Sequence, residues 1–208
     1  RLEPISEHPK ANILYLVDRP ESPQTIVCQF LTAPKRTTPD YYALRLIDTI
    51  WGGGFQSRLN QNLREEKGYT YGISSAMALY STSGYWKVQT AIQADKTGEV
   101  VRELMAELQG LAGERPITET EVTEAKTNRI RGYAQQFETL RRITSIIGGL
   151  WSANLPLSEI QDTVSKIACT TLEEVHAAAR QHLKPDQAAF LLVGDRSQIE
   201  PQLAEHGL

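Results

Sequence analysis

The chain has 208 residues, enough for one large domain with a sizeable core, and we expect a single domain over residues 1–208. Its composition, 40% hydrophobic and 23% charged, is ordinary for a globular protein. A formal net charge of −3 without any basic run excludes the electrostatic footprint of a protein that binds nucleic acid or an anionic membrane surface.

No membrane or targeting segment is predicted. No apolar stretch approaches the roughly 20 residues that span a bilayer. Residues 1–11 are polar and include two prolines, unlike a signal peptide, and Arg1 in place of Met indicates a processed chain or a piece of a longer one. We expect a soluble protein of the bacterial periplasm or cytoplasm, the compartment being left open. Cys28 and Cys169 are expected to be unpaired thiols.

The first elements predicted are two strands and a helix. Residues 12–17 and 24–31 are short apolar runs on either side of a proline-containing turn. Thr38 is the expected N-cap of the helix, with Pro39 in its first position. Three glycines, residues 52–54, end that helix and permit a sharp change of direction.

A second helix is expected over residues 55–66, followed by a hairpin. Phe55, Leu59 and Leu63 recur at the helical spacing and predict a narrow stripe that points into the core. Gly68 ends this helix as a left-handed cap. The stretches 69–80 and 85–92 are rich in strand-forming residues and flank a turn of serine, threonine and glycine, so an antiparallel hairpin is predicted.

The rest of the chain is mainly helical. An amphipathic stripe follows residue 95, and a capping box at Thr118 begins a long helical stretch toward residue 151, expected to bend or break at residues 148–149. A short helix follows residue 156, and a second capping box at Thr171 begins a helix that ends near residue 183. Residues 188–193 form an apolar run typical of a buried strand.

The order of these elements predicts the fold class. Strands and helices come in groups and do not alternate singly, which disfavours a doubly wound parallel sheet. An α+β fold, a largely antiparallel sheet with helices packed on one face, fits the order best.

The densest group of informative residues is 52–72, and Arg64 and Tyr71 are its candidates for chemistry. At 100° per residue, Arg64 lies on the opposite side of the helix from Phe55 and so faces away from the core. Tyr69 and Tyr71 fall on one face of the following strand by its two-residue period. An arginine and a tyrosine at one helix–strand corner can both donate hydrogen bonds to a peptide carbonyl or its oxyanion. Spacing alone favours the other interpretation, a solvated Arg64 paired with Glu65, Glu66 or another surface acid and a Tyr71 that packs on the sheet, because most charged residues at helix ends are solvated.

The run 52–71 resembles the signature of the second, non-zinc-binding domain of insulinase (pitrilysin) type zinc metallopeptidases. The resemblance rests on the triple glycine, Ser57-Arg58-Leu59, Leu63-Arg64-Glu65 and Lys67-Gly68-x-x-Tyr71. Residues 16–19, 170–171 and 192–195 agree with it, so it covers essentially the whole chain.

The resemblance implies a fold of the mitochondrial-processing-peptidase type and a role beside a catalytic partner. In that family a zinc-bearing domain and a similar domain without zinc face each other like a clamshell around a peptide. An arginine and a tyrosine seven residues later reach the substrate from the second domain, and Arg64 and Tyr71 match those positions, with Tyr69 a weaker alternative. The expected partners are a zinc-bearing homologous domain or subunit and a peptide substrate, and self-association is possible.

A zinc site within this chain is not predicted. The histidines are His8, His176, His182 and His206, and none stands in His-x-x-Glu-His or its reverse. His176 and His182, six residues apart on one helix, do not line up on one face. The expected cofactor, zinc, would therefore be held by the partner domain, and this chain would be inactive alone.

The sequence is also compatible with two other functions. One is a structural subunit without proteolysis, as in the respiratory-complex core proteins that share this fold. The other is a free-standing peptide-binding protein. The presence of both Arg64 and Tyr71 favours the peptidase, because a purely structural subunit has no need of the pair.

Overall fold

The computed structural model describes residues 13–207. His8, and residue 12 at the start of the first predicted strand, lie outside this range. The elements in chain order are β1 (Ile13–Asp18), β2 (Gln24–Ala33), α1 (Tyr41–Asp48), η1 (Thr49–Gly53), η2 (Asn60–Glu66), β3 (Thr70–Leu79), β4 (Gly84–Gln93), η3 (Ala94–Lys96), α2 (Thr97–Gln109), η4 (Gly110–Glu114), α3 (Glu119–Arg131), η5 (Ala134–Phe137), α4 (Leu140–Ser152), α5 (Ser158–Cys169), α6 (Leu172–His182), η6 (Pro185–Gln187), β5 (Ala189–Gly194) and α7 (Arg196–Glu205).

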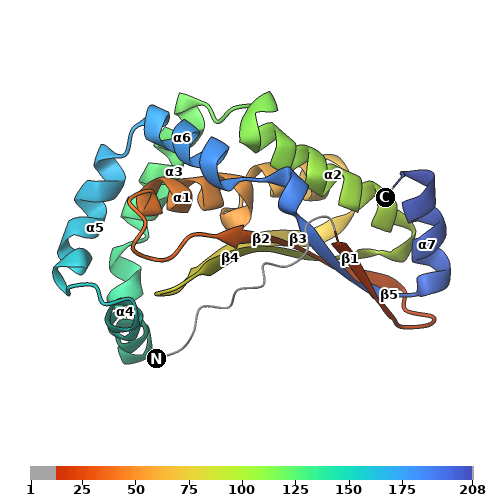
Figure 1. The fold of residues 1–208 in the computed structure, drawn as a ribbon, viewed down its shortest axis with the longest axis horizontal. Helices are drawn as coiled ribbons and strands as arrows, with labels where there is room; N and C mark the ends of the chain where they lie inside the picture. The colour runs from red at the N-terminus through yellow and green to blue at the C-terminus, as the bar shows by residue number, and fades with distance from the viewer. Residues whose placement is uncertain (1–12, 208) are drawn as a thin grey trace.

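A five-stranded sheet in the order β1-β5-β2-β4-β3 forms one layer, and helices form the other. The pairing of β1 with β5 is parallel, whereas the three other pairings are antiparallel. Helices α1, α2, α3 and α6 lie over one face of the sheet, α4 and α5 lie at one end and α7 at the other (Figure 1). The predicted α+β class, a largely antiparallel sheet with helices on one face, is confirmed.

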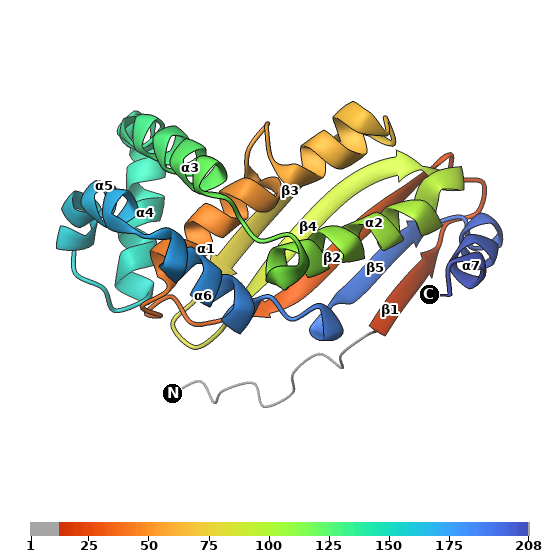
Figure 2. The ribbon, with the colours of Figure 1, turned by 90° about the horizontal axis from the view of Figure 1, so that it is seen from above.

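The core lies between the sheet and the helices. Alternate residues of β2 and β4 face it, including Val27, Leu31, Trp86 and Val88. Figure 2 shows α2 lying over the sheet, roughly along the direction of its strands, and the apolar stripe of α2 is buried there. These strands are therefore half-buried, with every second side chain in the core.

Both predicted capping boxes are present. The Thr118 hydroxyl accepts a hydrogen bond from the Glu121 amide, and the Thr171 hydroxyl accepts one from the Glu174 amide. These caps fix the starts of α3 and α6 because they satisfy amides that have no partner within the helix. None of the helices that the structure describes is long and apolar enough to cross a membrane.

Two predicted boundaries are wrong. Thr38 is not an N-cap, because its hydroxyl accepts from the Asp40 amide in a local turn and α1 begins only at Tyr41, after Asp40. The long helical stretch breaks at Gly132, where α3 ends, and not at residues 148–149, which lie within α4. After η5, Thr139 caps the next helix, α4, by accepting from the Arg142 amide.

Candidate functional site

The corner that carries Arg64 and Tyr71 begins with the close approach of η1 to β3. At Gly52, a Cβ atom would lie 2.8 Å from the Ser75 amide nitrogen, so only glycine fits there. The neighbouring Asp48 carboxylate is buried and accepts from the Ser75 hydroxyl at 2.8 Å and from the Trp86 indole at 2.7 Å. These contacts fix η1 against the sheet.

Asn60 joins η2 to the edge of β3. Its side-chain amide donates to the Ile73 carbonyl at 3.0 Å and to the Gly54 carbonyl at 3.1 Å, and the residue is only 6% exposed. It also donates to the Ser57 hydroxyl at 3.1 Å. Asn60 thus takes the place of a neighbouring strand for one residue of β3 and sets the distance between η2 and the sheet.

Arg58 has a structural role. Its guanidinium binds both carboxylate oxygens of Glu121, at 2.6 and 2.9 Å, and donates to the carbonyls of Arg115 and Pro116. Burial raises the pKa of Glu121, but hydrogen bonds, first of all from Arg58, outweigh it and hold that pKa below its ordinary value. Arg58 therefore ties η2 to the start of α3 and is not free for a substrate.

Arg64 is partly exposed and lies over an aromatic ring. Its guanidinium carbon is 4.5 Å from the centre of the Phe55 ring, and its Nε lies 3.5 Å from a Glu65 carboxylate oxygen. Phe55 is 67% exposed, so the expectation that it points into the core, opposite Arg64, is wrong. Phe55 precedes the helix, and η2 is wound as a π-helix, so the spacing of 100° per residue does not apply here.

Tyr69 and Tyr71 point in different directions. Tyr69 packs against the core, and its hydroxyl donates to Glu99, a bond that raises the pKa of Tyr69 above its ordinary value. Tyr71 is 94% exposed. The expectation that both share one face is wrong, because a bulge between Thr70 and Ile73 inserts an extra residue and interrupts the two-residue period.

Two threonines hold this bulge. The Thr90 hydroxyl of β4 lies 2.8 Å from the Thr70 hydroxyl and 3.0 Å from the Gly72 carbonyl, and its single proton is donated to this pair of acceptors. The Thr70 hydroxyl in turn accepts from the Gly72 amide at 3.1 Å. The hydroxyls bond the backbone that the bulge leaves unpaired, and they fix the place from which Tyr71 projects.

The structure places Arg64 and Tyr71 on adjoining elements. The Tyr69 amide donates to the Leu63 carbonyl at 2.9 Å, which joins the end of η2 to the start of β3. Neither a hydrogen bond nor an ion pair links Arg64 with Tyr71. The sequence did not predict that the Phe55 ring supports the Arg64 guanidinium. The position of Phe55 between Gly54 and the polar Gln56 is, however, an unusual one for a core residue.

A groove begins beside this corner and follows the edge of the sheet. It has a volume of about 660 Å³, and its lining includes Phe55, Ala76 and Met77 on one stretch and Arg45 and Arg129 on another. β3 is the outermost strand; Asn60 covers its edge at Ile73 and Gly52 packs against Ser75, and the groove borders the strand from Ser75 to Met77.

The side chains that the structure describes do not fit a zinc ion. Within residues 13–207 no group of three or more His, Cys, Asp and Glu side chains could hold a metal. His176 and His182 each have another partner: the Ile117 carbonyl at 2.6 Å and the Asp40 carboxylate at 2.7 Å, respectively.

Comparison with known proteins gives consistent matches. A family described as "Peptidase M16 inactive domain" matches residues 1–129. An uncharacterized zinc protease of Mycobacterium tuberculosis is 32% identical over 179 residues, which is 86% of this chain and 40% of that protein. The chain therefore spans about two fifths of the length of the curated relatives it matches.

Solved structures share the fold. The crystal structure of a peptidase M16 inactive domain from Pseudomonas fluorescens has a TM-score of 0.80 and 26% identity, covering 93% of this chain and 46% of that one. A chain of complex III2 from Candida albicans has a TM-score of 0.72 at 16% identity, covering 94% of this chain and 46% of that one. The second match establishes similarity of fold alone.

Proposed function

Because the chain belongs to the peptidase M16 family, as its inactive domain, we propose that it closes over a peptide in a zinc endopeptidase and assists cleavage from the side opposite the metal. The zinc-bearing half is then another part of the same protein or a separate subunit. Its existence is supported by the length of the relatives, of which this chain spans about two fifths.

The observation that carries this proposal is the exposure of Tyr71 together with the position of Arg64 on the adjoining element. A bulge is maintained at the edge of the sheet and leaves Tyr71 94% exposed, where its hydroxyl has no described partner. The Arg64 guanidinium lies on the Phe55 ring, which orders it while its N–H groups stay available. Neither arrangement stabilises the domain's own core.

Together the two side chains can hold the carbonyl that is cleaved. Each donates a hydrogen bond to the carbonyl oxygen, and these bonds strengthen as negative charge develops on that oxygen in the transition state. Tyr69 is the poorer candidate for this role, since its hydroxyl already donates to Glu99.

The docking of a second half is supported by exposed apolar side chains on α4. Leu140 and Trp151 are each 83% exposed, at opposite ends of that helix. Large exposed apolar side chains in one element are typical of a surface that another domain covers. We expect this surface to contact the zinc-bearing half or, at high concentration, a second copy of the chain.

The test is cleavage of a peptide by the full-length protein. Arg64→Ala and Tyr71→Phe should each lower kcat/KM about 100-fold, on the order of 3 kcal/mol, and leave zinc content and unfolding unchanged. The double variant should lose less than the product of the two, because both groups serve one carbonyl.

Two matched controls accompany these variants. Arg102 pairs with the adjacent glutamate at 3.5 Å, as Arg64 does, so Arg102→Ala should be silent. Tyr15 is exposed on the opposite edge strand, so Tyr15→Phe should also be silent. Full activity of both Arg64→Ala and Tyr71→Phe would contradict the catalytic role and leave a structural subunit as the better interpretation.

A further inference from the structure

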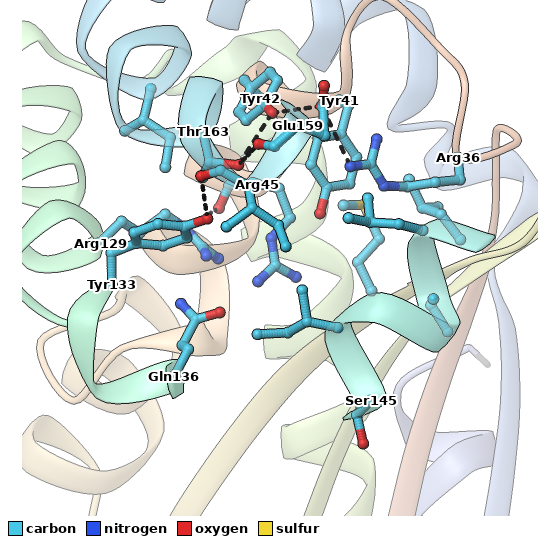
Figure 3. Close-up of a pocket in the computed structure, with 18 of the residues that line it drawn as sticks. Arg36, Tyr41, Tyr42, Arg45, Arg129, Tyr133, Gln136, Ser145, Glu159 and Thr163 are labelled. Atoms are coloured by element: carbon cyan, nitrogen blue, oxygen red, sulfur yellow. Dashed lines mark hydrogen bonds and ion pairs between the residues drawn. The ribbon is translucent and has the colours of Figure 1, made fainter. Parts of the chain in front are cut away.

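A second cavity lies at the far end of the β3 groove. It has a volume of about 370 Å³ and is formed by α1, α3, α4, α5 and the turn between β3 and β4. Figure 3 shows arginines and tyrosines from several of these elements around it. Its lining includes three arginines: Arg36 in the loop before α1, Arg45 on α1 and Arg129 on α3.

One of the three arginines is neutralised by its surroundings. The Arg36 guanidinium lies 3.3 Å from the centre of the Tyr41 ring and 3.5 Å from a carboxylate oxygen of Glu159. Glu159 is itself occupied, because it also binds the Tyr42 hydroxyl and the Lys166 ammonium group, each at 2.6 Å. Glu159 is therefore not available to the other two guanidinium groups.

Arg45 has no carboxylate partner among the described residues, and Arg129 has one at a long distance. Arg129 lies 3.7 Å from Oδ2 of the buried Asp48, whereas the neutral donors Ser75 and Trp86 bond Oδ1 of the same carboxylate. Among residues 13–207, no carboxylate lies within 4.0 Å of the Arg45 guanidinium. Burial, together with the neighbouring Arg45 cation, lowers the pKa of Arg129 to about 10. Two adjacent guanidinium groups facing a cavity form a favourable site for an anion.

This cavity continues into the groove that starts at the candidate site. Arg45, Arg129 and Met77 line both, and the groove reaches Phe55, on which Arg64 lies. Met77 is the sixth residue after Tyr71 along β3, so the two ends are about 20 Å apart at about 3.3 Å per residue. In an extended peptide held by Arg64 and Tyr71, a residue about six positions from the held carbonyl would reach Arg45 and Arg129.

We propose that the Arg45–Arg129 cavity binds a carboxylate of the peptide substrate, about six residues from the bond that is cleaved. This inference rests on the proposed function and adds a preference for acidic substrates to it. The carboxylate belongs either to an aspartate or glutamate side chain or to the C-terminus of the peptide. The planar guanidinium groups match a carboxylate in two-point geometry, and Met77, Leu150 and Ile146 in the lining suit the apolar part of a peptide.

The experiment measures binding without cleavage. The full-length protein is kept in a zinc chelator, and a fluorescent peptide is titrated by anisotropy. Peptides carry one glutamate or one glutamine, moved from the third to the eighth residue on either side of the cleaved bond, and end in a free carboxylate or an amide. The glutamate peptide should bind about tenfold more tightly than its glutamine twin at one position near the sixth residue. A preference for the free C-terminus instead would identify that carboxylate as the ligand.

Variants test whether the cavity causes the preference for the glutamate peptide. Arg45→Gln should abolish this preference and leave the affinity of the glutamine peptide unchanged, whereas Arg45→Lys should retain part of the preference. Arg102→Gln, at an exposed site on α2, should retain all of it. Equal loss for both peptides in Arg45→Gln, or no preference at any position in the unmodified protein, would overturn the proposal. Displacement by inorganic phosphate without any preference between the peptides would overturn it too.

The outcomes separate this inference from the proposed function. If Tyr71→Phe and Arg64→Ala cleave normally and Arg45 still sets the glutamate preference, the carboxylate site stands and the catalytic role fails. If the preference is absent while those two variants lose activity, the catalytic role stands and the carboxylate site fails.

Discussion

Replacement of Asn60 by alanine tests how the corner of η2 and β3 is held together. In the folded protein its side-chain amide serves the carbonyls of Gly54 and Ile73, both of which lie beneath η2. Alanine cannot serve either carbonyl, and water has little access because the site is 6% exposed.

The expected loss follows from the Ile73 carbonyl, because the Gly54 carbonyl still accepts a hydrogen bond from the Ser57 amide. A buried polar group left without a partner costs about 1 to 3 kcal/mol, so Asn60→Ala should lower the free energy of unfolding by about that amount. The loss should be accompanied by reduced order at the start of β3, where Ile73 would no longer have an edge partner.

The assay is urea unfolding followed by tryptophan fluorescence. Trp51 and Trp86 are both buried and pack edge to face at 5.5 Å, directly below this corner, so their emission reports on it. As a control, Asn128 is exposed on α3 and Asn128→Ala should change stability by less than about 0.5 kcal/mol. A loss below about 1 kcal/mol in Asn60→Ala would refute the view that this side chain acts as an edge strand.

Two further predictions concern stability. Burial opposes ionisation of Glu159, but hydrogen bonds, chiefly from Lys166, outweigh it and hold its pKa below the ordinary value, so the folded state gains stability from the ionised form. That gain is present above the unfolded pKa and is lost as the pH falls from about 5 through the lowered pKa of the folded state. The difference in unfolding free energy between the natural chain and Glu159→Gln should therefore shrink on acidification. A difference that stays constant with pH would contradict this prediction. Gly52→Ala should destabilise the fold by about 1 to 3 kcal/mol in the same unfolding assay, because the added methyl group would lie 2.8 Å from the Ser75 amide, whereas Gly72 has open space around it and Gly72→Ala should cost less.

Much of the fold could be predicted because its signals are local. The capping boxes at Thr118 and Thr171 and the serine-rich turn between β3 and β4 each specify a boundary through neighbouring residues alone. The grouping of these elements was then sufficient for the α+β class.

The errors arose where distant contacts override local periodicity. Phe55 lies outside η2, whose π-helical winding also departs from the spacing assumed for Arg64, and the separation of Tyr69 from Tyr71 depends on a bulge held by Thr90 of another strand. Neither can be read from spacing. Arg45 and Arg129 escaped notice because residues 84 positions apart show no pattern, although the structure joins them through the hydrogen bond from Arg129 to the Arg45 carbonyl.

The parallel pairing of β1 with β5 has a consequence for the order of folding. Residues 13–18 pair with residues 189–194, and β5 stands between β1 and β2 in the sheet. The growing chain therefore holds β1 without its partner, and one side of β2 uncovered, until Gly194 has left the ribosome. Contacts of such wide sequence separation form slowly, so the hairpin and its helices should assemble first and the first strand should be incorporated last. A chain truncated before residue 189 would retain most of its helices but present an unpaired β2 edge to other chains, and should aggregate.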